Sequence, residues 1–144
     1  MNIQRTALAY FDAVLRGYGQ LFLCNNPVSG VLFLLGLVLV SPENAAWSLV
    51  GAGLATLGAL LFGMKAEASS GLFGVNGALL GYSWIYFPEV DASAKALFTL
   101  IGCSATIAIL IPSLHWMNHL KSGITLFGIP SLIAVGLNLS LIHI

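Results

Sequence analysis

Uncharged amide side chains stand in two otherwise apolar stretches of this sequence. Gln20, Asn25 and Asn26 lie in the stretch GYGQLFLCNNPVSG, and Asn76 lies in GLFGVNGALLG. A buried amide without a hydrogen-bond partner costs about 1–3 kcal/mol. In a narrow apolar passage, the same groups can replace the water that a small polar solute must shed. These residues are therefore candidates for contact with such a solute.

A structural role is the alternative for most of these amides. Asn25 and Asn26 directly precede Pro27, and Asn is a preferred N-cap residue while Pro suits the first helical position. Asn76 would in that case tie two helices together. Gln20 stands before the expected cap, so capping does not account for it.

Other reactive residue types give weaker patterns. His115 and His119 are spaced as zinc ligands on one helix face, but no third ligand accompanies them, and Trp116 between them suits an interfacial anchor. Cys24 and Cys103 are expected to be small buried residues. No carboxylate pair and no Ser–His–Asp or Cys–His set falls within the apolar stretches. We therefore expect no bound metal, no cofactor and no enzymatic activity.

The elements that position these residues follow from the distribution of charge. The chain has 144 residues, of which 58% are hydrophobic and 7% are charged, whereas a soluble domain carries about 25% charged residues. This composition excludes a disordered tail, a nucleic-acid binder and an ordinary cytosolic enzyme. The charged residues leave five windows, each with room for the roughly 20 apolar residues of a membrane span: 17–42, 44–64, 68–88, 96–120 and 122–144. The sequence thus predicts an all-α membrane protein with five transmembrane helices.

The first eighteen residues predict an additional amphipathic helix. Apolar residues recur there at helical spacing, and Asp12 and Arg16 form an i,i+4 pair on the other side. Asp12 and Arg16 also interrupt the apolar run that a cleavable signal peptide requires. This helix either lies on the membrane surface or is a short helix tucked into the protein.

Basic residues in the short loops predict the orientation in a cell membrane. With the N-terminus on one side, that side carries four basic residues and the opposite side carries only Lys95. Since basic residues concentrate in cytoplasmic loops, we expect a cytoplasmic N-terminus. The four are Arg5, Arg16, Lys65 and Lys121.

Prolines and small residues mark helix ends and helix contacts. Pro42, Pro88 and Pro112 fall near the ends of windows, where helices can stop, whereas Pro27 and Pro130 indicate starts or breaks at membrane depth. Two stripes of small residues predict close helix packing. They consist of Gly51, Ala55, Ala59 and Gly63, and of Gly74, Gly77 and Gly81.

Three motifs carry a family resemblance. GYGQLFLCNNPVSG resembles the first pore signature of urea transporters, roughly G-x-x-Q-V-x-F followed by N-N-P-x-S-G. GLFGVNGALLG resembles the second signature of the same family, and GIPSLIAVGL, residues 128–137, is similar to a divergent copy of the third. The resemblance covers residues 3–138.

The resemblance implies a fold and an activity. Urea transporters are channel-like passive conductors built from two five-span halves of opposite orientation, with the pore between them, and they form homotrimers. Residues 1–138 would then be the first half of this inverted repeat, with the amphipathic N-terminal segment as a pore helix. Its partners would be urea, membrane lipid, and a missing C-terminal half or an inverted copy of the chain.

The resemblance also implies roles for individual residues. Gln20 matches a polar residue at the mouth of the urea path, and Leu21 and Leu79 match wall positions. Leu23 and Val75 match positions that are usually aromatic and sandwich the solute. Ile133 matches a position that is usually Thr and hydrogen-bonds urea. These departures leave a path for another short amide or for ammonia open, with Phe22 or Phe73 as neighbouring sources of an aromatic ring.

A passive mechanism follows from the chemistry of urea. Flat apolar walls fit the faces of this planar neutral molecule, while carbonyls freed by a helix break and the Gln20 side chain accept its N–H groups. A dry slot excludes ions because it cannot replace their hydration. No charged residue lies inside a window, so we expect downhill conduction without ion coupling.

Two alternatives concern the function and the end of the chain. A non-conducting membrane scaffold or assembly subunit is the rival function, and a water channel is disfavoured because the usual filter arginine is missing. We expect residues 139–144, LSLIHI, to be an adapter-derived tail, since one codon choice for them equals a transposon-end adapter of sequencing libraries. The other interpretation is a half-size protein that pairs with an inverted copy of itself.

Overall fold

The structure is a computed structural model that describes residues 3–120 together with residues 133, 136 and 140. Helices joined by short connections make up the described chain, and no strand occurs in it, which agrees with the all-α prediction. The elements are α1 (Ile3–Gln20), α2 (Pro27–Val40), α3 (Pro42–Leu61), α4 (Lys65–Ser69), α5 (Leu72–Tyr82), the 3-10 helix η1 (Ser83–Tyr86) and α6 (Ala92–Leu120).

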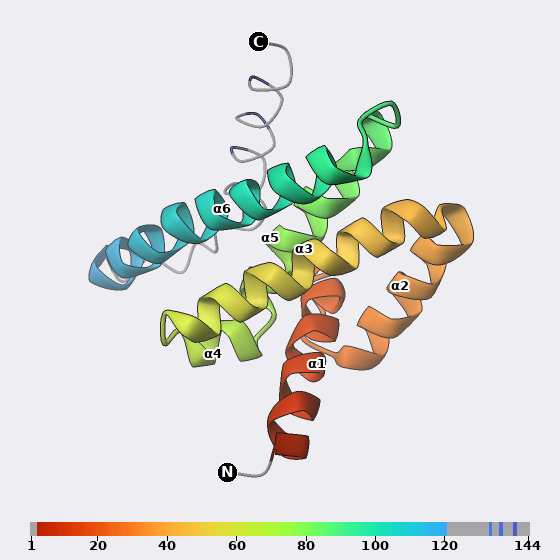
Figure 1. The fold of residues 1–144 in the computed structure, drawn as a ribbon. Helices are drawn as coiled ribbons and strands as arrows, with labels where there is room; N and C mark the ends of the chain where they lie inside the picture. Colours follow the sequence, from red (N-terminus) through yellow and green to blue (C-terminus); the bar gives the residue numbers. More distant parts are fainter. Residues whose placement is uncertain (1–2, 121–132, 134–135, 137–139, 141–144) are drawn as a thin grey trace.

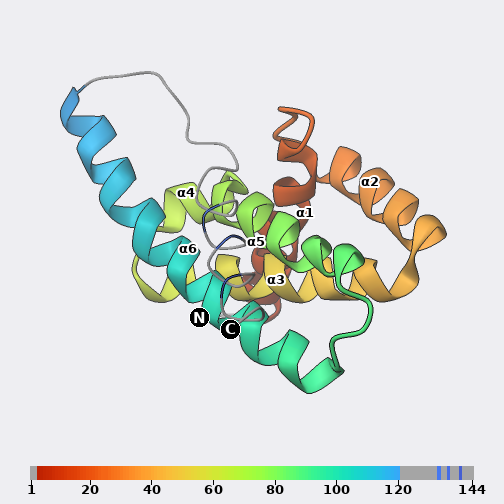
Figure 2. The same ribbon diagram turned by 90° about the horizontal axis from the view of Figure 1, so that it is seen from above.

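The helices pack around α3 and α5. These two helices make the most extensive contact of the described chain, and α1 packs against both α2 and α5. The long helices α3 and α6 run in the same general direction (Figure 1). Viewed from above, their C-terminal ends lie apart (Figure 2).

Backbone rather than side chains forms the joint between α3 and α5. A Cβ atom at Gly51 would lie 2.2 Å from the Gly77 carbonyl oxygen, and one at Gly77 would lie 2.1 Å from the Gly51 carbonyl oxygen. A Cβ at Gly81 would lie 2.1 Å from the carbonyl oxygen of Trp47. Only glycine permits this approach, so the prediction of close packing at these small residues is confirmed.

Two of the described helices are long and apolar enough to cross a membrane: Pro42–Leu61, and Ala92–Trp116 within α6. Less than half of the apolar window of each is buried, so large parts of their apolar faces point outward. The helices α2 and α5 have 14 and 11 residues. At a rise of ~1.5 Å per residue they extend about 21 and about 16 Å, which is less than the ~30 Å hydrocarbon core.

Of the five predicted spans, the described residues therefore contain two candidates, α3 and α6, and the number five is not confirmed. Charge-free windows overstate helix length where the chain breaks at uncharged residues. The first window contains the turn Leu21–Asn26, and the third contains Gly71 with its left-handed φ of 84°. The fifth window, with Pro130, lies outside the described residues except for the three single positions.

Most helix boundaries lie at the expected prolines, with Pro112 as the exception. Pro27 and Pro42 each begin a helix, and the Asn26 and Ser41 side chains accept hydrogen bonds as N-caps. Pro112, however, lies inside α6. The expectation that a helix ends there is wrong. Membrane helices tolerate an internal proline because neighbouring groups and local adjustments satisfy the freed carbonyl.

Gly63 also differs from its prediction, which was close packing against another helix as part of a stripe of small residues. It lies after the end of α3 with a φ of 78°, and a Cβ there would meet no atom within 4 Å. Gly63 therefore permits a left-handed turn and makes no helix contact.

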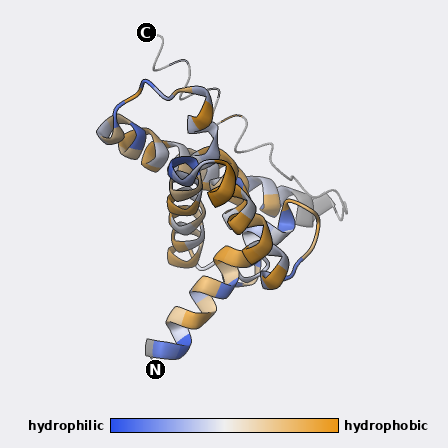
Figure 3. Cartoon of the chain, turned by 90° about the vertical axis from the view of Figure 1, so that its right-hand side faces the viewer, coloured by the Kyte–Doolittle hydropathy of each residue, from blue (hydrophilic) through white to orange (hydrophobic). Residues whose placement is uncertain are grey.

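The two ends of α1 lie in different surroundings. Ala13, Val14 and Tyr18 in its second half are buried, whereas Leu8 and Phe11 are 70% and 61% exposed. In Figure 3, α1 is hydrophilic at its beginning and mainly hydrophobic further along. The C-terminal half is thus tucked into the protein, as one of the two interpretations requires, and the apolar face of the first half is exposed.

Side chains rather than backbone attach α6 to the rest. Lys95 is 3% exposed, and its Nζ lies 2.7 Å from Glu43 Oε1 at the start of α3. The buried indole Nε1 of Trp84 donates a hydrogen bond of 2.8 Å to Thr99 Oγ1. Beyond these contacts α3 and α6 enclose an apolar groove of about 610 Å³, lined from Leu54 to Phe62 and from Leu100 to Pro112.

Candidate solute site

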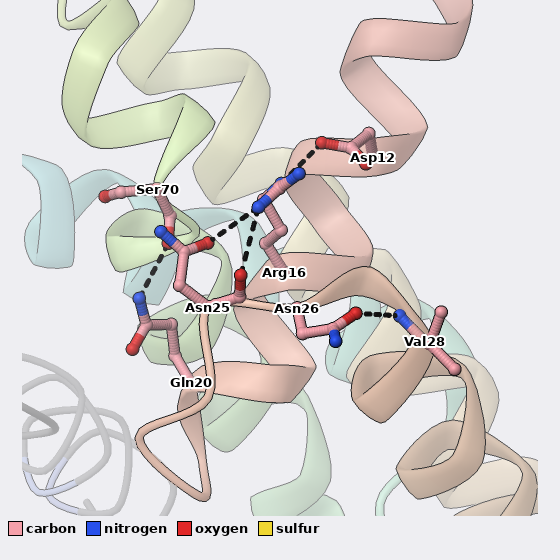
Figure 4. Close-up of polar contacts among 7 residues, drawn as sticks. All are labelled: Asp12, Arg16, Gln20, Asn25, Asn26, Val28 and Ser70. Carbon is pink, nitrogen blue, oxygen red and sulfur yellow. Dashed lines mark hydrogen bonds and ion pairs between the residues drawn. The ribbon is translucent and has the colours of Figure 1, made fainter.

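The first signature motif forms the turn that follows α1 and leads into α2 (Figure 4). Backbone hydrogen bonds from Phe22, Leu23 and Cys24 return to the carbonyls of Gly19 and Gln20. Leu23 has a φ of 58°, which is the left-handed region that side chains rarely adopt. The turn therefore needs further contacts to hold its shape.

Arg16 provides these contacts. Its Nε lies 2.5 Å from Asp12 Oδ2, which confirms the predicted i,i+4 pair. A second guanidinium nitrogen donates to the backbone carbonyl of Asn25 at 3.0 Å and to the Asn25 Oδ1 at 3.1 Å (Figure 4). Asn25 is therefore held by Arg16 and does not cap α2.

Asn26 fills the capping role alone. Its Oδ1 accepts a 2.9 Å hydrogen bond from the backbone N–H of Val28, and Pro27 occupies the first helical position. The structural interpretation of this amide is therefore correct, because Asn26 is the N-cap of α2.

Gln20 joins α1 to the turn before α5. Its Nε2 donates a 2.8 Å hydrogen bond to the carbonyl oxygen of Ser70 (Figure 4). The next residue, Gly71, sits so close to α1 that a Cβ would lie 2.5 Å from Gly17 N. The amide nitrogen of Gln20 is thus anchored, and the carbonyl half of this half-buried side chain is the part that can accept a hydrogen bond.

Asn76 does not tie two helices together through its amide nitrogen. Nδ2 donates to the carbonyl of Leu72, 2.9 Å away in the same helix. The Oδ1 atom is buried, and it has no hydrogen-bond partner among the described residues. The expectation of an interhelical bond is therefore corrected.

A small pocket lies beside the turn. Its volume is about 250 Å³, below the range of roughly 300–1,000 Å³ that accommodates drug-sized ligands, so it suits a small solute. Leu21 and Leu79, which the sequence assigns to the wall of a solute path, come together in it. The full lining consists of Leu21, Phe33, Leu37, Ser48, Ala78, Leu79 and Tyr82.

Sequence reasoning missed most of this lining. Phe33 supplies an aromatic ring, and the exposed ring of Phe22 packs edge-on against it with centroids 5.3 Å apart. Ser48 supplies a hydroxyl from α3. The signal for Ser48 was a hydroxyl in an apolar window, but nothing in the local sequence indicates that α3 faces α5 at this position.

The sequence is similar to known membrane transport proteins over nearly its whole length. A family model described as urea transporter matches residues 11–143. The chain belongs to the urea transporter family. Urea transporter 1 of Ovis aries is 34% identical over 136 residues, covering 93% of this chain and 35% of the relative. Urea transporter 1 of Mus musculus is 33% identical over 116 residues, covering 72% of this chain and 29% of the relative. The chain thus spans about a third of the length of the curated relatives that it matches.

Family membership confirms the resemblance but does not test the six predicted site residues. Leu23 is 76% exposed and Val75 is 2% exposed, and neither lines the pocket. Ile133 is a helical residue, 45% exposed, among neighbours outside the described residues. Phe73 is fully buried in the core of α3, α5 and α6, so it offers no ring to the pocket.

Metal ligation finds no support in the described part of this urea transporter chain. No group of three or more His, Cys, Asp or Glu residues that can hold a metal occurs there. Cys103 is buried as expected, whereas Cys24 is exposed in the turn, so the expectation that both cysteines are buried is wrong for Cys24.

Proposed function

We propose that the chain forms the first membrane-embedded half of a passive conductor of urea or a similar small neutral amide. Residues 1–138 constitute this half, with α1 as its pore helix and five spans in all. The N-terminus lies on the cytoplasmic side of the cell membrane. A C-terminal half or an inverted copy completes the pathway, and the intact protein forms a homotrimer. Residues 139–144 remain proposed as an adapter-derived tail.

The observation that carries this proposal is the meeting of Leu21 and Leu79 in one small pocket next to Gln20. These residues are 58 positions apart in the sequence, by subtraction of their numbers, and belong to two different signature motifs. Family membership alone does not require them to share a wall. Their proximity supports a solute path that passes the end of α1 and the last turns of α5.

Passage through this region suits a neutral planar solute. Leucine side chains provide apolar walls in the pocket. Gln20 directly precedes Leu21, and its carbonyl oxygen is the part that can accept a hydrogen bond because its nitrogen is anchored to Ser70. Each hydrogen bond to a protein oxygen offsets part of the hydration that urea loses. An ion would lose far more hydration than such a wall can restore.

The arrangement of polar groups favours conduction without an ion gradient. The charged residues of the described helices lie at their ends or, as with Asp12 and Arg16, pair with one another. No Asp, Glu, His, Lys or Arg side chain is among the described residues that line the small pocket. Coupling to protons or sodium needs such a group or a coordinating set of oxygens, so we propose downhill flux.

Urea flux through the full gene product in liposomes tests the proposal. Stopped-flow light scattering measures how fast vesicles respond to a urea gradient. We expect faster urea entry than in protein-free vesicles, and a loss of about three- to tenfold in Gln20→Leu, the effect of one hydrogen bond. Gln4→Leu is the matched control, because Gln4 is exposed at the start of α1, and it should conduct like the wild type.

The outcomes separate the proposal from its rivals. Vesicles that hold correctly inserted protein but conduct no small solute would favour a scaffold. Ammonia or water flux without urea flux would assign the path to those solutes. Equal urea flux in the wild type and in Gln20→Leu would remove the role proposed for Gln20 while leaving conduction intact.

A further inference from the structure

A chain of hydrogen bonds runs behind the small pocket. The Tyr18 hydroxyl donates to Ser48 Oγ at 3.0 Å, and Ser48 Oγ donates to the carbonyl oxygen of Ala78 at 3.0 Å. All three residues are at most 1% exposed. The chain joins α1, α3 and α5, and its central member, Ser48, belongs to the pocket lining.

The direction of these bonds fixes what Ser48 can still do. A serine hydroxyl has one proton and two lone pairs. Its proton is engaged by Ala78 and one lone pair is engaged by Tyr18. What remains is one lone pair, so Ser48 can accept one further hydrogen bond but cannot donate one.

Ser48 is also well placed to select a solute. It belongs to the pocket lining and is 1% exposed, so little water reaches it. Leu21, Leu37 and Leu79 provide apolar lining around it. A solute that reaches Ser48 has lost water on several sides, which makes a missing hydrogen bond costly.

We propose that this pocket is a binding site for a small N–H donor of the amide class, with Ser48 Oγ as the acceptor. The Tyr18 hydroxyl occupies the other lone pair of Ser48, which leaves one lone pair for the solute. The identity of the solute as an amide rests on the proposed function, whereas the preference for N–H donors rests on the hydrogen-bond chain.

The site distinguishes two solutes of similar size and shape. Acetamide brings N–H groups to Ser48, whereas acetone brings only a carbonyl oxygen, which meets a lone pair and gains no bond. A single neutral hydrogen bond to a protein group corresponds to a roughly three- to tenfold difference in dissociation constant. We therefore expect acetamide to bind at least about threefold more tightly than acetone.

The test is a titration of the full gene product in detergent micelles, carrying ¹³C-methyl alanine. The Ala78 methyl group lies beside the hydrogen bond, so its resonance reports occupation of the pocket. In the wild type it should shift at lower acetamide than acetone concentrations. In Ser48→Ala the two solutes should bind alike. Ser113→Ala, which removes a hydroxyl that donates to the Ile109 carbonyl in α6, is the control and should keep the preference.

Several outcomes would overturn the site. Equal binding of acetamide and acetone by the wild type refutes it even if Ser48→Ala does not fold. An acetamide preference that survives in a folded Ser48→Ala protein refutes the role of Ser48. Tyr18→Phe keeps the acceptor and should keep the preference, so its loss with the fold intact would also contradict the assignment.

The flux experiment tests the proposed conduction, and the binding experiment tests the proposed site, so either result can be negative without the other. A wild type that conducts no urea in liposomes but prefers acetamide at Ala78 leaves this site standing and rejects the proposed conduction. Urea flux without the preference does the reverse, since it leaves conduction standing and rejects the site.

Discussion

The contacts of α3 with α5 and of α3 with α6 are built on opposite principles. At the first, glycine backbones lie against each other with no room for one added carbon. At the second, the Lys95–Glu43 ion pair joins α6 to α3, the Trp84–Thr99 hydrogen bond joins α6 to η1, and a groove of about 610 Å³ remains between α3 and α6. The α3–α5 contact also bears Ser48 and Ala78, which lie in the wall of the small pocket. The backbone contact fixes the position of that wall. The contacts of α6 consist of separate side chains, so each can be removed by a single substitution.

The substitution Gly77→Ala should have the largest effect, because it attacks the backbone joint. Its Cβ would lie 2.1 Å from the Gly51 carbonyl oxygen and 2.7 Å from the Ala55 Cβ, so α3 and α5 must separate. We expect a loss of more than about 3 kcal/mol, beyond the usual cost of an overpacked site. Elution as a single species in detergent and the thermal unfolding midpoint measure it.

A matched alanine substitution shows whether the joint is the cause. Gly36→Ala in α2 adds the same carbon where no atom lies within 4 Å. It should be neutral or stabilise by up to about 1 kcal/mol, because alanine favours a helix over glycine. If the two variants unfold at the same temperature, the α3–α5 joint is not the tight contact described above.

Thr99→Val should have an intermediate effect, because it removes one attachment of α6. The buried Trp84 indole N–H would lose its acceptor, and an unpaired buried donor costs about 1–3 kcal/mol. Thr106→Val is the matched comparison. Thr106 is equally buried in the same helix, but its hydroxyl has no partner among the described residues.

The two threonine variants should therefore change the free energy of unfolding in opposite directions or by different amounts. Thr106→Val removes an unsatisfied polar atom at nearly constant shape and should leave stability unchanged or raise it. Chemical unfolding of both proteins in micelles measures the difference. Equal destabilisation by both would mean that α6 is held by close packing like α5, and the contrast between the two contacts would disappear.

The smallest effect should appear at the first residue before α6. Asp91 Oδ1 accepts hydrogen bonds from Ser93 N and Ala94 N, at 2.9 and 3.0 Å. The Ser93 hydroxyl bond is the main cause that lowers the pKa of Asp91, with the Ala94 backbone bond next. A folded pKa below the unfolded one stabilises the protein above the unfolded value of about 3.9, and this contribution is lost as pH falls through the folded pKa.

Thermal unfolding between about pH 6 and about pH 3 tests this dependence on the carboxylate. Asp91→Asn does not titrate, so its unfolding temperature should fall less on acidification than that of the wild type. Asp91 is fully exposed, and the difference should be slight. If the unfolding temperature of Asp91→Asn fell more on acidification than that of the wild type, the stabilising role of the Asp91 carboxylate would be contradicted.

Local patterns predicted the parts of the fold that depend on nearby residues. The N-terminal helix, the helix start at Pro27, the helix end just before Pro42 and the glycine contact all follow from spacing or from backbone preferences. Helix lengths did not follow, because the breaks at Asn25 and Gly71 involve no charge. Hydropathy records where charges are missing, and it does not record where the backbone turns.

The candidate site was predictable only where a motif carried it. Leu21 and Leu79 were assigned through the signature motifs, and they do line one pocket. The Tyr18–Ser48 pair joins residues 30 positions apart, and the Arg16–Asn25 bond depends on a turn with a left-handed residue. Such pairings arise from tertiary packing, so single-sequence patterns do not contain them.

The glycine contact between α3 and α5 also constrains how this sequence can diverge over evolution. At Gly51, Gly77 and Gly81 an added methyl group would overlap main-chain atoms of the facing helix, which no rotamer change relieves. Descendants that retain this geometry must keep glycine at these positions, whereas Gly36 is free to vary. Mutations are therefore expected to accumulate on the outer helix faces while the three glycines stay fixed.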